Sequence, residues 1–138
     1  MVSLNEAIEE VKKIAKTDME QCEKKAKEKG YPEETCIIHD LAFGIASDMI
    51  EYGDWAKETP DEVEEGFSEW WDNFTQYSDY ANVILPELRR AVGCKDTFEV
   101  GTYTDCTETQ LSQVDDLVDD LREKIFDYLM KIHHLVSE

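Results

Sequence analysis

The sequence predicts an all-α protein, an antiparallel bundle of four to five helices with one irregular or short hairpin loop near 94–106. Apolar residues recur every three to four positions along most of the 138-residue chain. Capping residues precede these stretches, and glycines follow several of them. The apolar fraction of 41% includes five Phe, six Tyr and three Trp, which is enough for a hydrophobic core. We therefore expect residues 1–138 to form a single helical domain.

The first helix is predicted to begin at Ser3 and to stop at Gly30. Ser3 and Glu6 have the spacing of a capping box, and apolar or small residues follow at helical intervals as far as Ala26. A glycine directly after such a pattern is a typical helix end.

The second helix is predicted to begin at Pro32, a residue suited to the first helical position, and to end at Gly53. Residues 37–50 are apolar around more than half of the helix circumference. Because such a wide apolar arc requires neighbours on two sides, we expect this helix to be the most buried one.

The third helix is predicted to begin with Thr59 as its N-cap, Pro60 as its first residue and Glu62 completing a capping box. Its core stripe consists of Val63, Phe67, Trp70, Phe74 and Tyr77, with Trp71 at the edge. The same phase continues through Leu85, Leu88 and Val92. We therefore expect one helix that is kinked at Pro86 and ends at Gly93.

Residues 94–106 alternate weakly around Gly101, which indicates a structured loop or a short hairpin. The last helix is then expected to start at Asp105 and Glu108. It carries a heptad seam of Leu111, Val114, Val118, Leu121, Ile125, Tyr128, Ile132 and Leu135. A second strip, Phe126, Leu129 and His133, could complete the core or serve as a homodimer surface.

The charge is strongly negative and unevenly distributed. Asp and Glu number 33 against 14 Lys and Arg, a net charge of −19. Residues 1–30 hold seven acids and seven bases, whereas residues 31–79 hold fourteen acids and one base. Such a field repels nucleic acid and anionic lipid and attracts basic proteins. We therefore expect no direct nucleic-acid binding and no membrane association.

The acids of the third and last helices form ridges that invite a functional explanation. Like charges at i, i+4 cost stability, and solubility would need fewer acids and more interspersed lysines. The proposed partner-binding residues are Glu58, Asp61, Glu62, Glu65, Glu69, Asp72, Asp79, Asp115, Asp116, Asp119, Asp120, Glu123 and Asp127. The leading hypothesis is a non-enzymatic inhibitor or adaptor that occupies the basic groove of a partner, such as a nucleic-acid-binding enzyme. In size, charge and helicity alone, it is similar to DNA-mimic antirestriction and anti-CRISPR proteins.

The four cysteines allow two interpretations. Cys22 and Cys36 could link the first two helices, and Cys94 and Cys106 flank the loop in the same way. However, Cys22 lies on an apolar stripe where a reduced cysteine is ordinary, so we expect thiols and keep disulfides as the alternative. No signal-like apolar run opens the chain, which favours a cytoplasmic over an extracellular protein.

Two other function classes remain as alternatives. The first is a secreted, disulfide-stapled bundle that binds an apolar ligand. The second is an all-α magnesium-dependent nucleotide pyrophosphohydrolase, for which the carboxylate pairs Glu6-x-x-Glu9 and Glu51-x-x-Asp54 are candidates. Cys36-x-x-His39 has metal-ligand spacing but supplies only two ligands, and a buried, hydrogen-bonded histidine is the preferred interpretation. We expect no catalytic residues, no metal and no cofactor.

Overall fold

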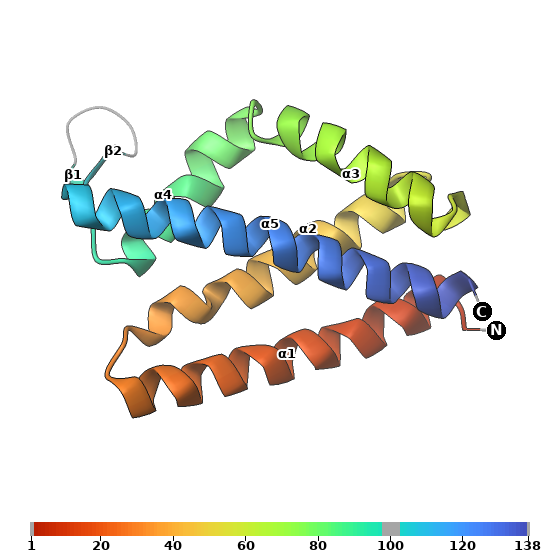
Figure 1. Cartoon of the computed structure of the whole chain (residues 1–138), viewed down its shortest axis with the longest axis horizontal. Helices are drawn as coiled ribbons and strands as arrows, with labels where there is room; N and C mark the ends of the chain where they lie inside the picture. Colours follow the sequence, from red (N-terminus) through yellow and green to blue (C-terminus); the bar gives the residue numbers. More distant parts are fainter. Residues whose placement is uncertain (1, 98–102, 138) are drawn as a thin grey trace.

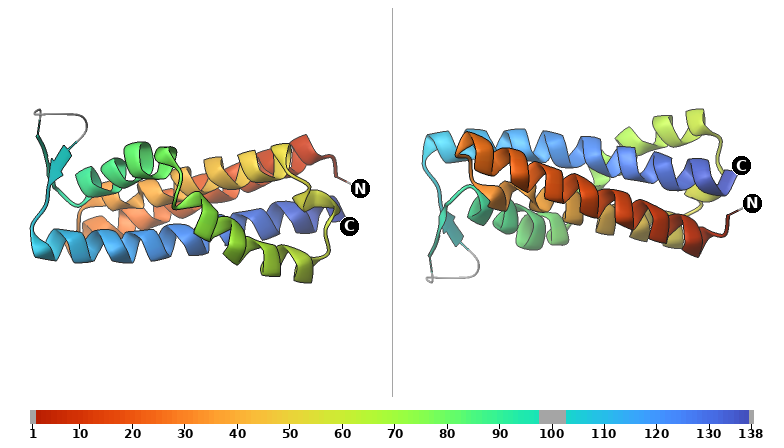
Figure 2. Two further views of the ribbon diagram at one scale, coloured as in Figure 1. Left: turned by 90° about the horizontal axis from the view of Figure 1, so that it is seen from above. Right: turned by 90° about the horizontal axis from the view of Figure 1, so that it is seen from below.

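The computed structural model describes residues 2–97 and 103–137 and confirms an all-α bundle (Figure 1). The described residues form five α-helices: α1 Leu4–Lys29, α2 Ile38–Tyr52, α3 Pro60–Phe74, α4 Leu85–Ala91 and α5 Glu108–Ser137. Helices α1, α2, α3 and α5 alternate in direction along the long axis, α4 continues the course of α3, and both termini lie at one end of the molecule (Figure 2). The antiparallel arrangement expected from the sequence is therefore present.

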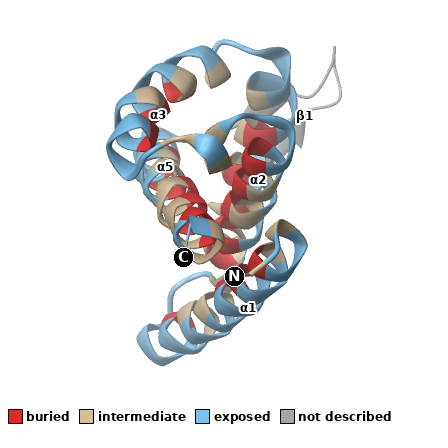
Figure 3. Ribbon diagram, turned by 90° about the vertical axis from the view of Figure 1, so that its right-hand side faces the viewer, coloured by how far each residue is buried: buried red, intermediate tan, exposed pale blue. Residues whose placement is uncertain are grey.

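Helix α5 is the central element because it contacts each of the other four α-helices. Seen end-on in Figure 3, the buried residues concentrate where α1, α2 and α5 face one another. One hydrophobic cluster takes side chains from all five helices, among them Val11, Ala42, Val63, Leu88 and Leu121. Among the described residues, no helix combines the length and the apolar composition needed to cross a bilayer.

The first helix has the predicted ends. The Ser3 hydroxyl accepts a hydrogen bond from the Glu6 N–H at 3.1 Å, which satisfies one of the free donors at the helix start. Gly30 ends the helix in the left-handed region, with φ of 73°, which a residue with a side chain rarely adopts.

The second helix begins later than predicted. The stretch Glu33–Ile37 is a 3₁₀-helix, and regular α-helix starts only at Ile38. The Thr35 hydroxyl donates to the Pro32 carbonyl at 3.0 Å, so a side chain occupies an acceptor that the first α-helical turn would use. Gly53 ends α2 as expected, and only glycine fits there, because a Cβ would lie 2.8 Å from the Met49 carbonyl oxygen.

The expectation of reduced cysteines was wrong, because both local pairs are disulfides. Cys22 of α1 is bonded to Cys36 of the 3₁₀-helix, with their Cα atoms 5.8 Å apart. Cys94 is bonded to Cys106 across the hairpin, with their Cα atoms 4.7 Å apart. Both separations lie in the range that a disulfide requires. The first bond joins α1 to the 3₁₀-helix that leads into α2, and the second fixes the connection between α4 and α5.

The third helix ends much earlier than predicted, at Phe74 rather than beyond Pro86. The Thr75 hydroxyl and the Gln76 side-chain amide both donate to the Asp72 carbonyl, at 3.2 and 3.0 Å. These bonds take the acceptor that the next helical turn would have used, so the helix stops. Tyr77, predicted to be in the core, is consequently 66% exposed.

The chain then bends and continues through the π-helix Tyr80–Ile84 into α4. The Leu85 N–H donates to the Tyr80 carbonyl in the wider i→i+5 pattern. This wide turn lies directly before Pro86, whose ring would clash with the carbonyl four residues earlier in a regular α-helix. The phase of Leu85 and Leu88 was therefore predicted correctly, but the main break lies at residues 75–77.

A short antiparallel hairpin connects α4 to α5. It consists of β1 Lys95–Thr97 and β2 Tyr103–Asp105, with Lys95 opposite Asp105. Gly101, at the expected turn, lies outside the described residues. The start of α5 differs from the predicted one. Thr107 and Gln110 form the capping box, each backbone N–H donating to the other's side chain at 2.9 and 3.1 Å.

The heptad seam of α5 lies in the core over its middle part. Leu121, Ile125, Tyr128 and Ile132 are fully buried, whereas Leu111 at the helix start is 44% exposed. The second strip completes the core: Leu129 and His133 are buried, and the Phe126 ring lies 5.0 Å from that of Phe67. The strip offered as a homodimer surface is therefore occupied by this chain's own helices.

Candidate functional site

The acids of α3 stand where the sequence placed them, on the side away from the core. Asp61, Glu62, Glu65, Glu69 and Asp72 are exposed. The Thr59 N–H donates to the Glu62 carboxylate at 3.0 Å, and this hydrogen bond lowers the pKa of Glu62. The negative charge at the start of α3 is thereby stabilised, and it also interacts favourably with the positive end of the helix dipole.

Two of the predicted residues do not belong to this ridge. Asp79 is exposed, but it lies beyond the end of α3, so the expected repeat of Glu65, Asp72 and Asp79 is interrupted. Glu58 lies before α3 and is half-buried, and its backbone carbonyl accepts a 2.6 Å hydrogen bond from His133 Nε2. Glu58 therefore helps to fix α3 against the end of α5.

The second ridge, on α5, is exposed from Asp115 to Glu123, whereas Asp127 is half-buried. Burial, followed by the nearby charges of Glu123, Asp116 and Asp119, raises the pKa of Asp120. The repulsion among these carboxylates is a free-energy cost that a cationic partner would remove. The ridge on α5 consists of Asp115, Asp116, Asp119, Asp120 and Glu123.

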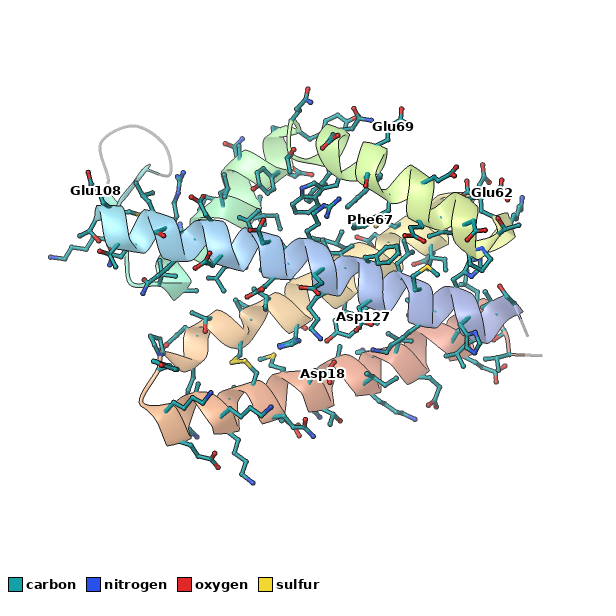
Figure 4. The ribbon with its side chains drawn as sticks, in the orientation of Figure 1. Asp18, Glu62, Phe67, Glu69, Glu108 and Asp127 are labelled. Atoms are coloured by element: carbon teal, nitrogen blue, oxygen red, sulfur yellow. A yellow bond between two sulfur atoms is a disulfide. The ribbon has the colours of Figure 1, made fainter. Side chains whose placement is uncertain are left out.

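Within the described part of the chain, Asp127 is the one predicted site residue that forms ion pairs. Among the described residues, its carboxylate lies 2.7 Å from Lys131 Nζ and 3.9 Å from Lys124 Nζ, and none of the other twelve forms an ion pair. Figure 4 shows Asp127 on the side of α5 toward α1, whereas Glu62 and Glu69 project away from α5. The thirteen acids thus do not share one face, and Asp127 is not part of the candidate surface.

A groove between α3 and α5 brings the two ridges together. It has a volume of about 440 Å³, and its walls carry Glu64 from α3 and Asp119 and Glu123 from α5. One cation, Arg122, lies among them, donating to the Ser68 hydroxyl at 3.2 Å and lying 5.7 Å from the centre of the Phe67 ring. We call Glu64, Asp119, Glu123 and the exposed acids of both ridges the acidic surface.

Glu64 was missing from the predicted set although it lines this groove. It follows Val63 by one residue and therefore stands about 100° around the helix from a core position. That angle identifies a flank of α3, but only the position of α5 shows that this flank faces the second ridge.

A separate polar network lies on the other side of α5. Tyr128, which is fully buried, donates its hydroxyl proton to Asp18 Oδ2 at 2.8 Å. Its oxygen also lies 3.0 Å from Nδ1 of His39, and His39 is 8% exposed. The preferred interpretation of His39 as a buried, hydrogen-bonded histidine is confirmed. The metal alternative for Cys36 and His39 loses its sulfur ligand, because Cys36 is in a disulfide.

The carboxylate pairs considered for a magnesium hydrolase do not come together. Within residues 2–97 and 103–137, no three His, Cys, Asp or Glu side chains are arranged to hold a metal ion. Comparison with family models, with curated proteins and with solved structures gives no match to this chain.

Proposed function

We propose that this protein is a non-enzymatic inhibitor or adaptor whose acidic surface, centred on the groove between α3 and α5, binds the basic surface of a protein partner. The observation that carries the proposal is that the acids of both ridges are exposed and form no ion pair with any described residue. Three carboxylates and one guanidinium line the groove, so it is itself net negative.

The energetics favour a cationic partner. Carboxylates crowded at i, i+4 repel one another, and this repulsion is present in the free protein. A partner that brings lysines or arginines into the groove replaces that repulsion with attraction and also speeds association. A nucleic-acid-binding enzyme is the partner class that we favour, because its groove is shaped for a row of phosphates and is already basic.

The test combines salt, competition and matched variants. Proteins captured from a lysate at low salt are identified, and each is assayed for affinity as salt rises and for displacement by a DNA duplex. We expect affinity to fall about tenfold or more between low and high salt, since exposed charges are screened beyond roughly 8–10 Å. We also expect DNA to compete.

A matched pair of variants locates the binding surface. The first carries Glu64→Gln, Asp119→Asn and Glu123→Gln, all in the groove. The control carries three changes on exposed acids of α1, Glu9→Gln, Glu20→Gln and Glu28→Gln, and has the same net charge. Only the groove variant should lose binding. Equal losses in both variants would show that net charge, not this surface, determines the affinity.

A second candidate function is favoured by the two disulfides, which are typical of oxidising compartments and hence of an extracellular protein. In this alternative the bundle binds a small apolar ligand. A hollow of about 590 Å³ between α2 and the α3–α4 segment is lined mainly by apolar side chains, including Ile45, Met49, Trp70, Phe74 and Ile84. An environment-sensitive apolar dye should bind the protein and increase in fluorescence, and it should bind the Ile45→Glu variant more weakly. Unchanged dye fluorescence on adding protein would argue against this alternative.

A further inference from the structure

A cationic cleft lies between α1, the 3₁₀-helix and α5, on the side of α5 that carries Tyr128 rather than the acidic groove. Its volume is about 400 Å³, and its walls include Lys25 and Lys29 of α1, Lys124 of α5, and His39. The disulfide between Cys22 and Cys36 forms part of the same wall and ties α1 to the 3₁₀-helix.

The charge of this cleft is opposite to that of the molecule. Three ammonium groups line it against one carboxylate, Asp18, and Asp18 already accepts a hydrogen bond from Tyr128. Lys25 and Lys29 are four residues apart on one face of α1 and form no ion pair with any described residue, whereas Lys27 between them pairs with Glu33. Two like charges at this spacing repel each other, and a bound anion would relieve the repulsion.

The hydrogen bonds of Tyr128 determine which ring nitrogen of His39 carries the proton. A phenol has one proton, and Tyr128 donates it to Asp18 at 2.8 Å. Nδ1 of His39 must therefore donate its N–H to the Tyr128 oxygen at 3.0 Å. Burial, and then the positive charge of Lys124, lowers the pKa of His39, so the ring is neutral at pH 7.

The other nitrogen, Nε2, then carries a lone pair. It has no hydrogen-bond partner among the described residues, and it is not sealed from solvent. A nearly buried imidazole with one unused acceptor thus lines a cleft that also carries three ammonium groups. A ligand that fits both features carries negative oxygen atoms and also an O–H donor.

We propose that the cleft between α1, α2 and α5 binds a small oxyanion that bears a hydroxyl group, the anion contacting Lys25, Lys29 and Lys124 and the hydroxyl donating to His39 Nε2. Hydrogen phosphate is the simplest such ligand, and a small hydroxy-carboxylate has the same chemistry. The volume of the cleft is in the range of small-molecule sites. This site is independent of the acidic surface.

The test uses pairs of probes that differ in the hydroxyl group. Phosphate is compared with sulfate, and malate with succinate, by following backbone amide shifts at constant ionic strength. We expect phosphate or malate to bind with a Kd of about 1 mM, and its hydroxyl-free counterpart to bind about tenfold more weakly, the effect of one hydrogen bond. The pair that shows the difference identifies whether a phosphate or a carboxylate is preferred.

Matched lysine variants distinguish a site from general attraction. Lys25→Gln with Lys29→Gln removes two cations of the cleft, and Lys12→Gln with Lys16→Gln removes two at the same spacing elsewhere on α1. All four side chains are exposed, so folding should be unaffected. Binding should weaken at least about tenfold in the first variant and change less than about twofold in the second.

A third variant, His39→Phe, removes the acceptor while keeping an aromatic ring, and it should lose the preference for phosphate over sulfate. Its fold is checked by circular dichroism. Three results would overturn the proposal: no saturable shifts for any probe, equal effects of the two lysine pairs, or equal binding of the probes in each pair.

Discussion

Replacing Tyr128 with Phe removes one oxygen from the buried network and leaves the ring in place. The hydroxyl makes two hydrogen bonds, at 2.8 Å to the Asp18 carboxylate and at 3.0 Å to His39 Nδ1. A bond to a charged group contributes about 1.5–3 kcal/mol and a neutral one about 1 kcal/mol. Asp18 is half-buried and can partly rehydrate, so we expect the free energy of unfolding to fall by about 2–3 kcal/mol.

Packing should contribute little to this loss, because the Phe ring fills the same space. Lys124 and Lys131, whose ammonium nitrogens lie 5.9 and 5.8 Å from the centre of the Tyr128 ring, would keep their contacts with it. The matched control is Tyr80→Phe: this tyrosine is half-buried, and its hydroxyl makes no hydrogen bond with a described residue. The control should change the free energy of unfolding by less than about 0.5 kcal/mol.

The assay is urea denaturation followed by tryptophan fluorescence, in a double-mutant cycle with Asp18→Ala. If the hydroxyl and the carboxylate act together, the coupling energy should reach at least about 1 kcal/mol. A Tyr128→Phe variant as stable as the control, with coupling near zero, would refute the view that the network stabilises the fold. If Asp18→Ala acted only by disrupting α1, it would lower the free energy of unfolding by the same amount with Tyr or with Phe at position 128, and the coupling energy would be zero.

Three further predictions concern the disulfides, the acidic ridge and pH. Replacing Cys22 and Cys36 with Ala should lower the free energy of unfolding by about 3 kcal/mol, because the bond closes a loop with a sequence separation of 14; an unchanged urea midpoint would contradict this. Asp120→Asn should raise stability by a few tenths of a kcal/mol, about 0.3 after allowing for solvent screening, and the gain should vanish in high salt. His39 has a lowered pKa when folded, so its unfolded state binds more protons below pH 6.5. The contribution of neutral His39 to the free energy of unfolding should therefore be fully present above pH 6.5 and be lost as the pH drops from there toward the folded pKa. His39→Gln should flatten that part of the plot of stability against pH.

The ends of helices were predictable where one residue determines them locally. Ser3, Gly30 and Thr59 act through their own side chains or backbone angles, and the structure confirms all three. The early end of α3 could not be predicted, because the stretch directly after Phe74 lacks the glycine or proline that usually marks a break. Its cause is competition by Thr75 and Gln76 for a single carbonyl, and such side-chain bonds have no periodic signature in sequence.

The start of α5 shows a different limit of sequence reasoning. Asp105-x-x-Glu108 and Thr107-x-x-Gln110 both have the capping pattern, two residues apart. The chain uses the second because Asp105 is paired with Lys95 in the hairpin, a contact that depends on how the strands align. Likewise, spacing indicated which cysteines could pair, but oxidation depends on Cα separations that only the folded chain provides.

The candidate sites also differ in how much of them the local sequence could predict. The exposure of the acids followed from the helical period, so most of the acidic surface could be predicted. The network of Asp18, Tyr128 and His39 could not, because its members are separated by 89 and 110 residues and Tyr128 fitted the heptad seam. Lys25 and Lys29 belong to a helix whose charges sum to zero, and a balanced total conceals a local excess.

Helix α5 separates two surfaces of opposite charge, and this has a consequence for both proposals. Asp119 and Glu123 face α3, whereas Lys124 lines the cleft toward α1. Because charges interact weakly beyond a Debye length of about 8 Å at physiological salt, each surface should bind its own ligand without much effect on the other. At low salt the Debye length is longer, so the charges of the two surfaces interact. Neutralising the groove acids should then strengthen anion binding in the cleft, because it reduces the long-range repulsion of the anion. The same change should weaken binding of a basic partner, so one triple variant would shift the two affinities in opposite directions.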